Sequence, residues 1–317
     1  MRSKFKIAIL GLGGVGGYIG EKLAAHYAAS NEIEIDFIAR GENGRIIKED
    51  GLKLITPQGE LIAHPSFITG QPEELGLVDL IICCVKNYDL ETSIESLKPC
   101  IKKDTIILPF LNGVDASERI RKIIPQAEIW DGCVYILSRL MAPGIVKQSA
   151  GLNQFYFGSA KASKEKLKRI ETILKEAGIN AFLSENISET IWEKFFFISM
   201  IATLTSYFDL GIGYIINNHE GRELLLNLLS ELKAVADAKQ ISLPNNIIQK
   251  TLDKIFSLPY ETLSSMHSDF KRGGQTEVDS LTGYTVKAGM ETGIPTPNYE
   301  RIWKGLLEKL QPQTAAI

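Results

Sequence analysis

Cysteine, net charge and long apolar runs are all scarce in this chain of 317 residues. Its four cysteines form no Cys-x-x-Cys pair and no Cys/His cluster, which argues against a zinc site or a disulfide framework. A net charge of −3 gives no basic surface for nucleic acid or anionic lipid. No run reaches the roughly 18 apolar residues of a membrane-spanning helix. We therefore expect no metal, no nucleic-acid partner and no membrane contact.

The first residues, MRSKFKIAIL, mimic the charged and apolar regions of a secretion signal. Glycines interrupt the apolar run within a few residues, and no small-residue cleavage site follows. This pattern predicts a first β-strand and a cytoplasmic protein.

Glycine is plentiful directly after this strand. A G-x-G-x-x-G pattern is matched by Gly11, Leu12, Gly13, Gly14, Val15 and Gly16. The first glycine allows a tight turn, the second lets a pyrophosphate approach the backbone, and the third lets helix and strand pack closely. The N–H groups that open the following helix, predicted over residues 14–29, would hold the phosphates. We predict a dinucleotide site here; a purely structural turn is the alternative.

The end of the second strand, IEIDFIA, bears on which dinucleotide binds. An NAD site usually has an acidic residue about 20 residues after the glycines to bond the ribose 2′-hydroxyl. Asp36 is near that distance but lies inside the strand, whereas Arg40 follows its end. A guanidinium suits a 2′-phosphate, so we predict NADPH. The alternative for Arg40 is a solvated loop charge.

The two halves of the chain differ in pattern. The first half alternates strand-like and helix-like segments, which predicts an α/β fold with a doubly wound parallel sheet of the Rossmann type. From Asn186 the long segments are helical, and Asn186 with Glu189 forms a capping box. We therefore predict an NADP-binding domain over residues 1–183 and an all-helical domain over residues 184–317. Helices of this second domain could supply the contact of a homodimer.

Two polar residues follow buried strands of the first half. Lys86 comes after VDLIICCV and Asn112 after TIILPFL, on the sheet edge where ligands bind in such folds. An Asn-Gly pair is also a turn former, so Asn112 is equally compatible with a turn.

Lys194 lies in a helix, IWEKFFFISMIA, that is apolar nearly all round. Such a lysine must snorkel, find a partner or face a cavity. A partly desolvated lysine has a lowered pKa and can protonate the oxygen of a ketone that receives a hydride. Snorkelling is the alternative.

The segment SSMHSDFKRGGQTEVDSLTGY holds two further candidates. Thr276 and Asp279 form a predicted capping box, so Glu277 should start a helix, where an acidic residue is favourable in any case. Ser265 alone is an ordinary polar loop residue.

Together these segments resemble the ketopantoate reductases (2-dehydropantoate 2-reductases) over almost the whole chain. The resemblance rests on the glycine loop, "AR" before Gly41, "GLKL" at Gly51, "VK" at Lys86, "NG" at Asn112, "APGIV" at Ala142, "WEK" at Lys194, "SSM" at Ser264 and "EVDSLTG" at Glu277. It implies a Rossmann domain and a helical domain with the active site in the cleft between them. It also implies NADPH-dependent reduction of a 2-oxoacid, ketopantoate, to pantoate in pantothenate and coenzyme A biosynthesis.

The resemblance also implies roles for single residues. Residues 11–16 would hold the pyrophosphate, and Arg40 and Lys86 the adenosine end with its 2′-phosphate. Asn112 would lie near the nicotinamide and the substrate. Lys194 would be the proton donor. Ser265 would bind the substrate, and Glu277 would fix the substrate or the ribose of the cofactor.

The sequence departs from the family pattern at three positions. Ile198, Ala202 and Thr262 stand where the family usually has asparagine. This leaves open a reductase of another branched 2-oxoacid. A β-hydroxyacid dehydrogenase is a further alternative, although Phe197 replaces the Asn or Asp expected three residues after the lysine. A nonenzymatic NADPH-binding module is the third.

Overall fold

The computed structural model describes residues 4–311, and the chain divides into two compact units. The first unit runs to Leu111 and resumes over Asp115–Ile187. The second contains Asn112–Val114 and the chain from Ser188 onward. The short segment 112–114 thus belongs with the second unit, although its neighbours in the chain belong to the first. Within residues 4–311, no helix has the length and apolar character needed to cross a membrane.

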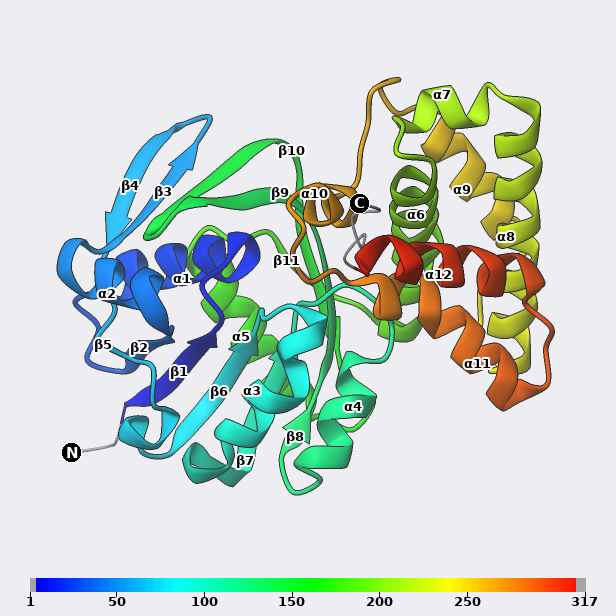
Figure 1. The fold of residues 1–317 in the computed structure, drawn as a ribbon. Helices are drawn as coiled ribbons and strands as arrows, with labels where there is room; N and C mark the ends of the chain where they lie inside the picture. Colours follow the sequence, from blue (N-terminus) through cyan, green and yellow to red (C-terminus); the bar gives the residue numbers. More distant parts are fainter. Residues whose placement is uncertain (1–3, 312–317) are drawn as a thin grey trace. The chain divides into compact units, whose positions relative to one another are not determined.

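A six-stranded parallel sheet forms the centre of the first unit, in the order β5-β2-β1-β6-β7-β8 (Figure 1). Its strands are β1 (Phe5–Leu10), β2 (Ile33–Ile38), β5 (Phe67–Thr69), β6 (Val78–Cys83), β7 (Ile101–Pro109) and β8 (Glu128–Ile129). The strand order reverses between β1 and β6, and ligands bind at such switch points beyond the carboxyl ends of the strands. The predicted doubly wound sheet is confirmed.

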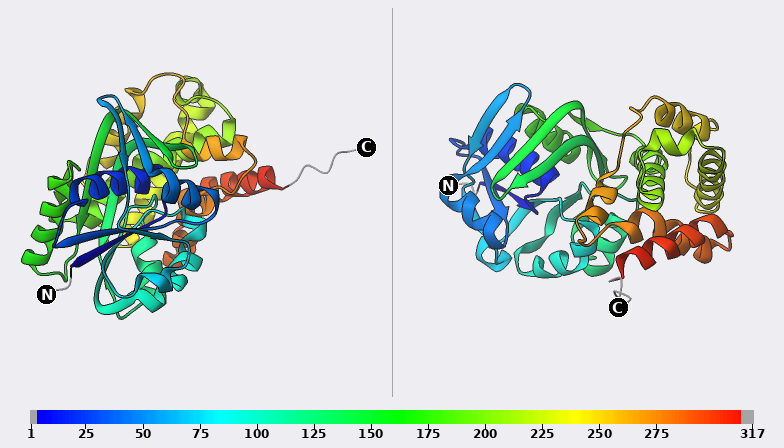
Figure 2. Two further views of the ribbon diagram at one scale, coloured as in Figure 1. Left: turned by 90° about the vertical axis from the view of Figure 1, so that its left-hand side faces the viewer. Right: turned by 45° about the horizontal axis from the view of Figure 1, so that its top comes forward.

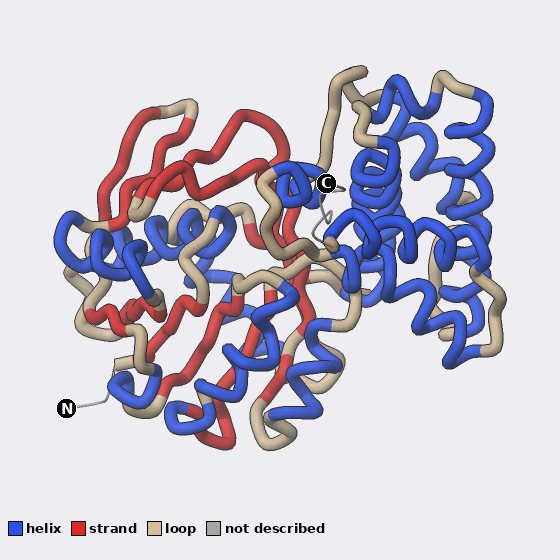
Figure 3. Tube along the Cα trace, viewed as in Figure 1, coloured by secondary structure: helices blue, strands red, loops and turns tan. Residues whose placement is uncertain are grey.

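A second sheet in the same unit was not predicted. It has the order β11-β10-β3-β4, with β9 paired to β10, and Figure 3 shows its strands in red. Its strands are β3 (Leu52–Thr56), β4 (Gly59–Ala63), β9 (Asp131–Ala142), β10 (Ile145–Gly158) and β11 (Ala181–Leu183). The segment EIWDGCVYIL divides at the fully buried Trp130 into β8 and β9 of different sheets.

Helices cover both faces of the parallel sheet. They are α1 (Gly14–Tyr27), α2 (Gly41–Asp50), α3 (Leu90–Ser96), α4 (Ala116–Ile123) and α5 (Lys164–Glu176). α1 packs between the two sheets, as the left view of Figure 2 shows, and buries Ile19 and Leu23 in the core they share. On the other face α3 and α4 pack with Ile94 and Ile120 against Ile81 and Ile107.

The second unit is helical around the long buried helix α6 (Ile187–Phe208). The other helices are α7 (Ile212–Ile216), α8 (His219–Ala238), α9 (Ile247–Phe256), α10 (Ser265–Lys271), α11 (Tyr284–Thr292) and α12 (Pro297–Leu310), and residues 279–283 form a π-helix. Phe195, Phe196 and Met200 of α6 are fully buried in one core with Leu228 and Tyr299. The apolar pattern that predicted a buried helix therefore reflects its packing.

Asp36 is fully buried in the middle of β2, so its carboxyl is not at the end of the strand. Lys6 Nζ lies 3.6 Å from Asp36 Oδ2, but burial dominates and raises the pKa of Asp36 from 3.8 to about 6. Because the folded pKa exceeds the unfolded one, this carboxyl stabilises the fold below pH 4, and that contribution is lost as the pH rises to about 6.

We expect Asp36→Asn to raise the free energy of unfolding at pH 7.5 by about 1–3 kcal/mol and to change little at pH 4. Urea denaturation at both pH values measures this difference. Glu34→Gln is the control, because Glu34 lies on the same strand, is partly exposed and also pairs with Lys6. A variant that is less stable than the wild type at pH 7.5 would show that the ion pair with Lys6 outweighs the cost of burial.

Candidate active site

The glycine loop connects β1 to α1, and at one position its backbone has free space beside it. Gly11 has φ +87°, and a Cβ there would lie 3.0 Å from the backbone N of Val85. A Cβ on Gly16 would lie 1.9 Å from the carbonyl O of Gly11, so only glycine permits this turn. A Cβ on Gly13, in contrast, would meet nothing within 4 Å. The loop is therefore closed against the sheet at its ends and accessible in the middle.

α1 begins beside this opening without a side-chain cap and without an acidic residue in its first turn. Its first N–H groups and the positive end of its dipole can therefore receive an anion. Leu12 and Val15 pack their side chains into or against the core, which leaves only their backbone for a ligand.

A cavity of about 280 Å³ lies at the carboxyl ends of β1, β2 and β6. Gly11, Leu12, Gly13, Arg40 and Lys86 line it, as predicted for cofactor residues; Gly14, Val15 and Gly16 do not. Sequence reasoning did not single out the other polar residues of the lining, which are Asn43, Asp89, Ser93 and Ser96. They lie on α2, on α3 or just before α3, two helices that the sequence analysis did not predict.

Arg40 is exposed, lines the cavity and precedes the first residue of α2. Across residues 4–311 its guanidinium makes no hydrogen bond or ion pair. A Cβ on Gly70 would lie 3.3 Å from Arg40 Cγ, so the side-chain stem rests on a glycine. Asn43 is committed elsewhere, since its amide bonds the Leu12 carbonyl at 3.2 Å and the Gly144 N–H at 2.7 Å.

The second unit brings three of the predicted residues together. Lys194 Nζ donates to Asn112 Oδ1 at 3.0 Å, and Asn112 Nδ2 donates to Glu277 Oε2 at 3.2 Å. Lys194 and Glu277 are 5% and 3% exposed, so neither is a solvated surface charge. Lys194 therefore does not snorkel: it has an amide partner inside the unit.

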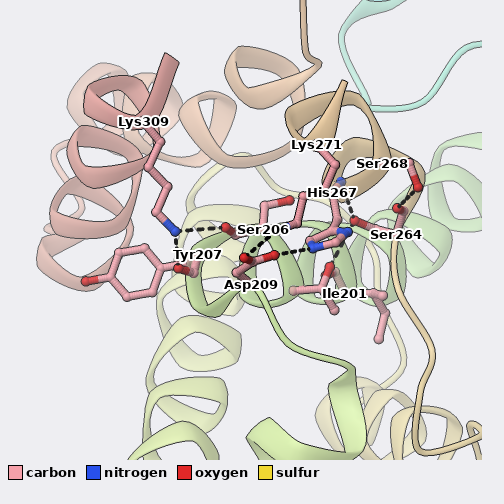
Figure 4. A network of polar contacts seen from close by, with 10 residues as sticks. Ile201, Ser206, Tyr207, Asp209, Ser264, His267, Ser268, Lys271 and Lys309 are labelled. Atoms are coloured by element: carbon pink, nitrogen blue, oxygen red, sulfur yellow. Dashed lines mark hydrogen bonds and ion pairs between the residues drawn. The ribbon is translucent and has the colours of Figure 1, made fainter. Parts of the chain in front are cut away.

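Ser265 has a different setting from these three residues. It is the exposed first residue of α10, and the preceding Ser264 caps this helix by accepting from the His267 N–H at 2.9 Å. Asp209, just after α6, binds His267 Nε2 at 2.7 Å and Lys271 Nζ at 2.6 Å (Figure 4). These two hydrogen bonds hold the pKa of Asp209 below its usual range, with Lys271 the larger cause. The network fixes α10, and with it Ser265, against the end of α6.

The predicted capping box at Thr276 is wrong. Thr276 Oγ1 is buried and has no hydrogen-bond partner among the described residues. Asp279 instead accepts from Trp303 Nε1 at 3.1 Å, and residues 279–283 form the π-helix rather than an α-helical first turn. Glu277 is therefore positioned by its bond to Asn112 and not by a helix cap.

The three positions that depart from the family pattern are either apolar, as Ile198 and Ala202 are, or hydrogen-bonded within the chain, as Thr262 is. Ile198, one turn after Lys194, is half-buried and packs against the helical core, and Ala202 is buried in that core. Thr262 Oγ1 donates to the Pro259 carbonyl at 2.7 Å and thereby closes a turn. Among residues 4–311, no group of three or more His, Cys, Asp or Glu side chains is placed to hold a metal ion.

Comparison with known proteins identifies the same family in both parts of the chain. Residues 7–162 match the family model "Ketopantoate reductase PanE/ApbA", and residues 186–309 match "Ketopantoate reductase PanE/ApbA C terminal". The crystal structure of 2-dehydropantoate 2-reductase from Porphyromonas gingivalis W83 is 36% identical, with a TM-score of 0.83, and the match covers 96% of this chain and 100% of that one.

Two further relatives carry other names. An "Uncharacterized oxidoreductase YkpB" from Bacillus subtilis is 26% identical over 302 residues, which are 95% of this chain and 97% of the relative. A D-mandelate dehydrogenase, solved with NADH and anilino(oxo)acetate, is 26% identical with a TM-score of 0.83, covering 96% of this chain and 98% of that one.

Proposed function

The chain belongs to the ketopantoate reductase family, and on that premise we propose that it reduces 2-dehydropantoate to pantoate with NADPH, on the route to pantothenate and coenzyme A. The observation that carries this proposal is the hydrogen-bonded set of Lys194, Asn112 and Glu277. In this proposal residues 1–183 bind the cofactor, and residues 184–317 supply Lys194, Ser265 and Glu277. The homodimer and the cytoplasmic location stay predictions.

The cavity of the first unit fits a nicotinamide dinucleotide. The open backbone at Gly13 and the uncapped start of α1 suit the pyrophosphate. Arg40 suits a 2′-phosphate, because its guanidinium is positive and has no competing partner among the described residues. Asp36, which lies near the usual sequence distance for an acid that bonds a 2′-hydroxyl, is buried in β2. These features together favour NADPH over NADH.

The reaction needs a proton on oxygen. When bound, the reduced nicotinamide supplies a hydride to the carbonyl carbon of the 2-oxoacid. Lys194 Nζ gives a proton to the carbonyl oxygen, which becomes the hydroxyl of the product. Asn112 holds the lysine through Oδ1 and Glu277 through Nδ2, so the donor is oriented before the substrate arrives. Lys194 then regains its proton from water.

A second substrate class is favoured by a specific observation. Ile198 and Ala202 offer no hydrogen bond on the face of α6 that carries Lys194, whereas asparagines there could bond a hydroxylated substrate. The similar D-mandelate dehydrogenase was solved with an oxoacetate that carries an anilino group. Reduction of a 2-oxoacid with an apolar side chain is therefore the second candidate.

The other two alternatives have less support. Phe197 packs against the helical core three residues after Lys194, where a β-hydroxyacid dehydrogenase is expected to carry Asn or Asp. A nonenzymatic module would have no use for a buried lysine held by an amide, which is the arrangement seen here.

We expect Lys194→Ala to lower kcat by roughly 10²–10⁴, the usual range for a general acid. The Kd for NADPH should stay within about twofold, because the lysine is assigned to the substrate and not to the cofactor phosphates. Steady-state kinetics and NADPH fluorescence measure the two effects. Glu193→Gln is the control, since Glu193 neighbours Lys194 and, among the described residues, pairs at the surface with Lys250. A folded Lys194→Ala variant with wild-type kcat contradicts the assigned role.

Arg40→Ala should remove the preference for NADPH. Its charge-assisted hydrogen bonds to a 2′-phosphate are worth roughly 1.5–3 kcal/mol, or about ten- to a hundredfold in kcat/KM. The kcat/KM for NADH should change little. Arg45→Ala is the matched control, because Arg45 is an exposed arginine of α2, the helix that Arg40 precedes, and pairs with Glu49. Equal use of NADH and NADPH by the wild type would overturn the assignment of Arg40.

Turnover of 2-dehydropantoate and 2-oxoisovalerate by the wild type and by Ile198→Asn tests the substrate. We expect the wild type to reduce both, with kcat/KM for 2-dehydropantoate no more than about tenfold higher, because an apolar wall discriminates weakly. Ile198→Asn should increase that preference. Leu226→Asn, at an exposed site on α8, is the control.

Three results decide between the candidates. A wild-type preference for 2-oxoisovalerate that Ile198→Asn reverses favours the second candidate. A preference for 2-dehydropantoate by several orders of magnitude, unchanged in Ile198→Asn, shows that other residues recognise the hydroxyl. NADPH binding without turnover of any 2-oxoacid favours the nonenzymatic module.

A further inference from the structure

The guanidinium of Arg119 holds the loop that follows β6. Arg119 lies on α4, and its Nη2 donates to the Asn87 carbonyl at 2.8 Å while its Nη1 donates to Asn87 Oδ1 at 3.2 Å. Its Nε and Nη2 also donate to the two carboxylate oxygens of Glu91 on α3, at 2.7 and 2.9 Å. Asp115 Oδ1 lies 3.7 Å from Nη1. One side chain thus joins the loop, α3 and the start of α4, which pack side by side.

The loop held in this way is the one that carries Lys86. Asn87 is 1% exposed, so its carbonyl has no access to bulk water. The Asp89 N–H donates to the Lys86 carbonyl at 2.9 Å and closes a 3₁₀ turn over Asn87–Asp89. Lys86, directly before Asn87, and Asp89, two residues after it, both line the cavity. Arg119 therefore holds the backbone at Asn87, the residue directly after Lys86.

Only arginine can make this set of contacts. The planar guanidinium presents donors in a fixed fork, so one group can bond a carboxylate with two parallel contacts and a carbonyl with another. The hydrogen bonds from Arg119 lower the pKa of Glu91, because they stabilise its ionised carboxylate. A lysine at this position could reach one of these acceptors at a time.

We propose that Arg119 is a positioning residue for Lys86 and thereby sets the affinity for the adenosine phosphates of NADPH. Arg119 does not line the cavity, so we assign it no direct contact with the cofactor. It acts by holding Asn87, and through the backbone it limits where the Lys86 ammonium can lie. The inference rests on the proposed function, which assigns Lys86 to the adenosine end.

A double-mutant cycle between Arg119→Met and Lys86→Ala tests this coupling, with NADPH fluorescence and competition by 2′,5′-ADP as the binding readouts. Lys86→Ala should raise the Kd for NADPH by about ten- to a hundredfold, and Arg119→Met by about three- to twentyfold. The double variant should bind within about twofold of Lys86→Ala alone, because positioning a missing lysine has no effect. The kcat at saturating NADPH should not change in Arg119→Met.

Arg121→Met is the matched control on the same helix. Arg121 binds Asp131 and the Ile129 carbonyl rather than the loop, so its loss should leave the Kd unchanged. Arg119→Lys should recover part of the affinity lost in Arg119→Met. If Arg119→Met does not fold, the cycle with Arg119→Lys carries the same test.

Two results would overturn the inference. One is an unchanged Kd for NADPH in a folded Arg119→Met variant. The other is a double variant in which the fold-changes in Kd of the two single variants multiply. Thermal denaturation of the apo forms separates this role from a purely structural one, which would lower Tm and leave the Kd unchanged. A wild-type protein that binds neither NADPH nor 2′,5′-ADP would instead refute the proposed function.

Discussion

The proposed chemistry depends on the two hydrogen bonds that the side-chain amide of Asn112 makes to Lys194 and Glu277. A buried lysine and a buried glutamate each need a polar partner, because desolvating a charge without one is costly. A side-chain amide can accept with one end of a planar group and donate with the other, and Asn112 does this between Lys194 and Glu277. Leucine at this position would satisfy neither residue, and aspartate could not donate to Glu277 when ionised. One neutral side chain thus orients both the proposed proton donor Lys194 and the buried Glu277.

The proposed cofactor site depends on a different constraint. In the glycine loop, backbone atoms approach one another so closely that a side chain would not fit. Gly16 lies so near the Gly11 carbonyl that no side chain fits, and this contact sets the start of α1 against β1. The open backbone at Gly13 follows from the same turn. Charge then favours NADPH over NADH in our proposal, because Asp36 of β2 is buried whereas the exposed Arg40 follows the end of that strand. Neither constraint depends on the helical unit.

Local pattern was enough for the features that neighbouring residues determine. It predicted the doubly wound sheet, the placement of Lys86 and Asn112 after their strands, and the buried nature of α6. It could not pair Asn112 with Lys194 or Glu277, which lie 82 and 165 residues further along the chain. It also predicted a helix cap at Thr276 that fails because Asp279 binds Trp303, 24 residues away. The second sheet was missed for the same reason: its strands pair β3 with β10, far apart in sequence.

A crystal structure with NADP⁺ and the product pantoate tests whether Lys194 is the proton donor. The distance between Lys194 Nζ and the pantoate hydroxyl that arises from the carbonyl oxygen decides the matter. Our account predicts a hydrogen bond of about 3 Å, with Asn112 still bonded to the lysine. A Lys194 ammonium that stays away from this hydroxyl, with another group bonded to it, would contradict the assignment of Lys194 as the proton donor.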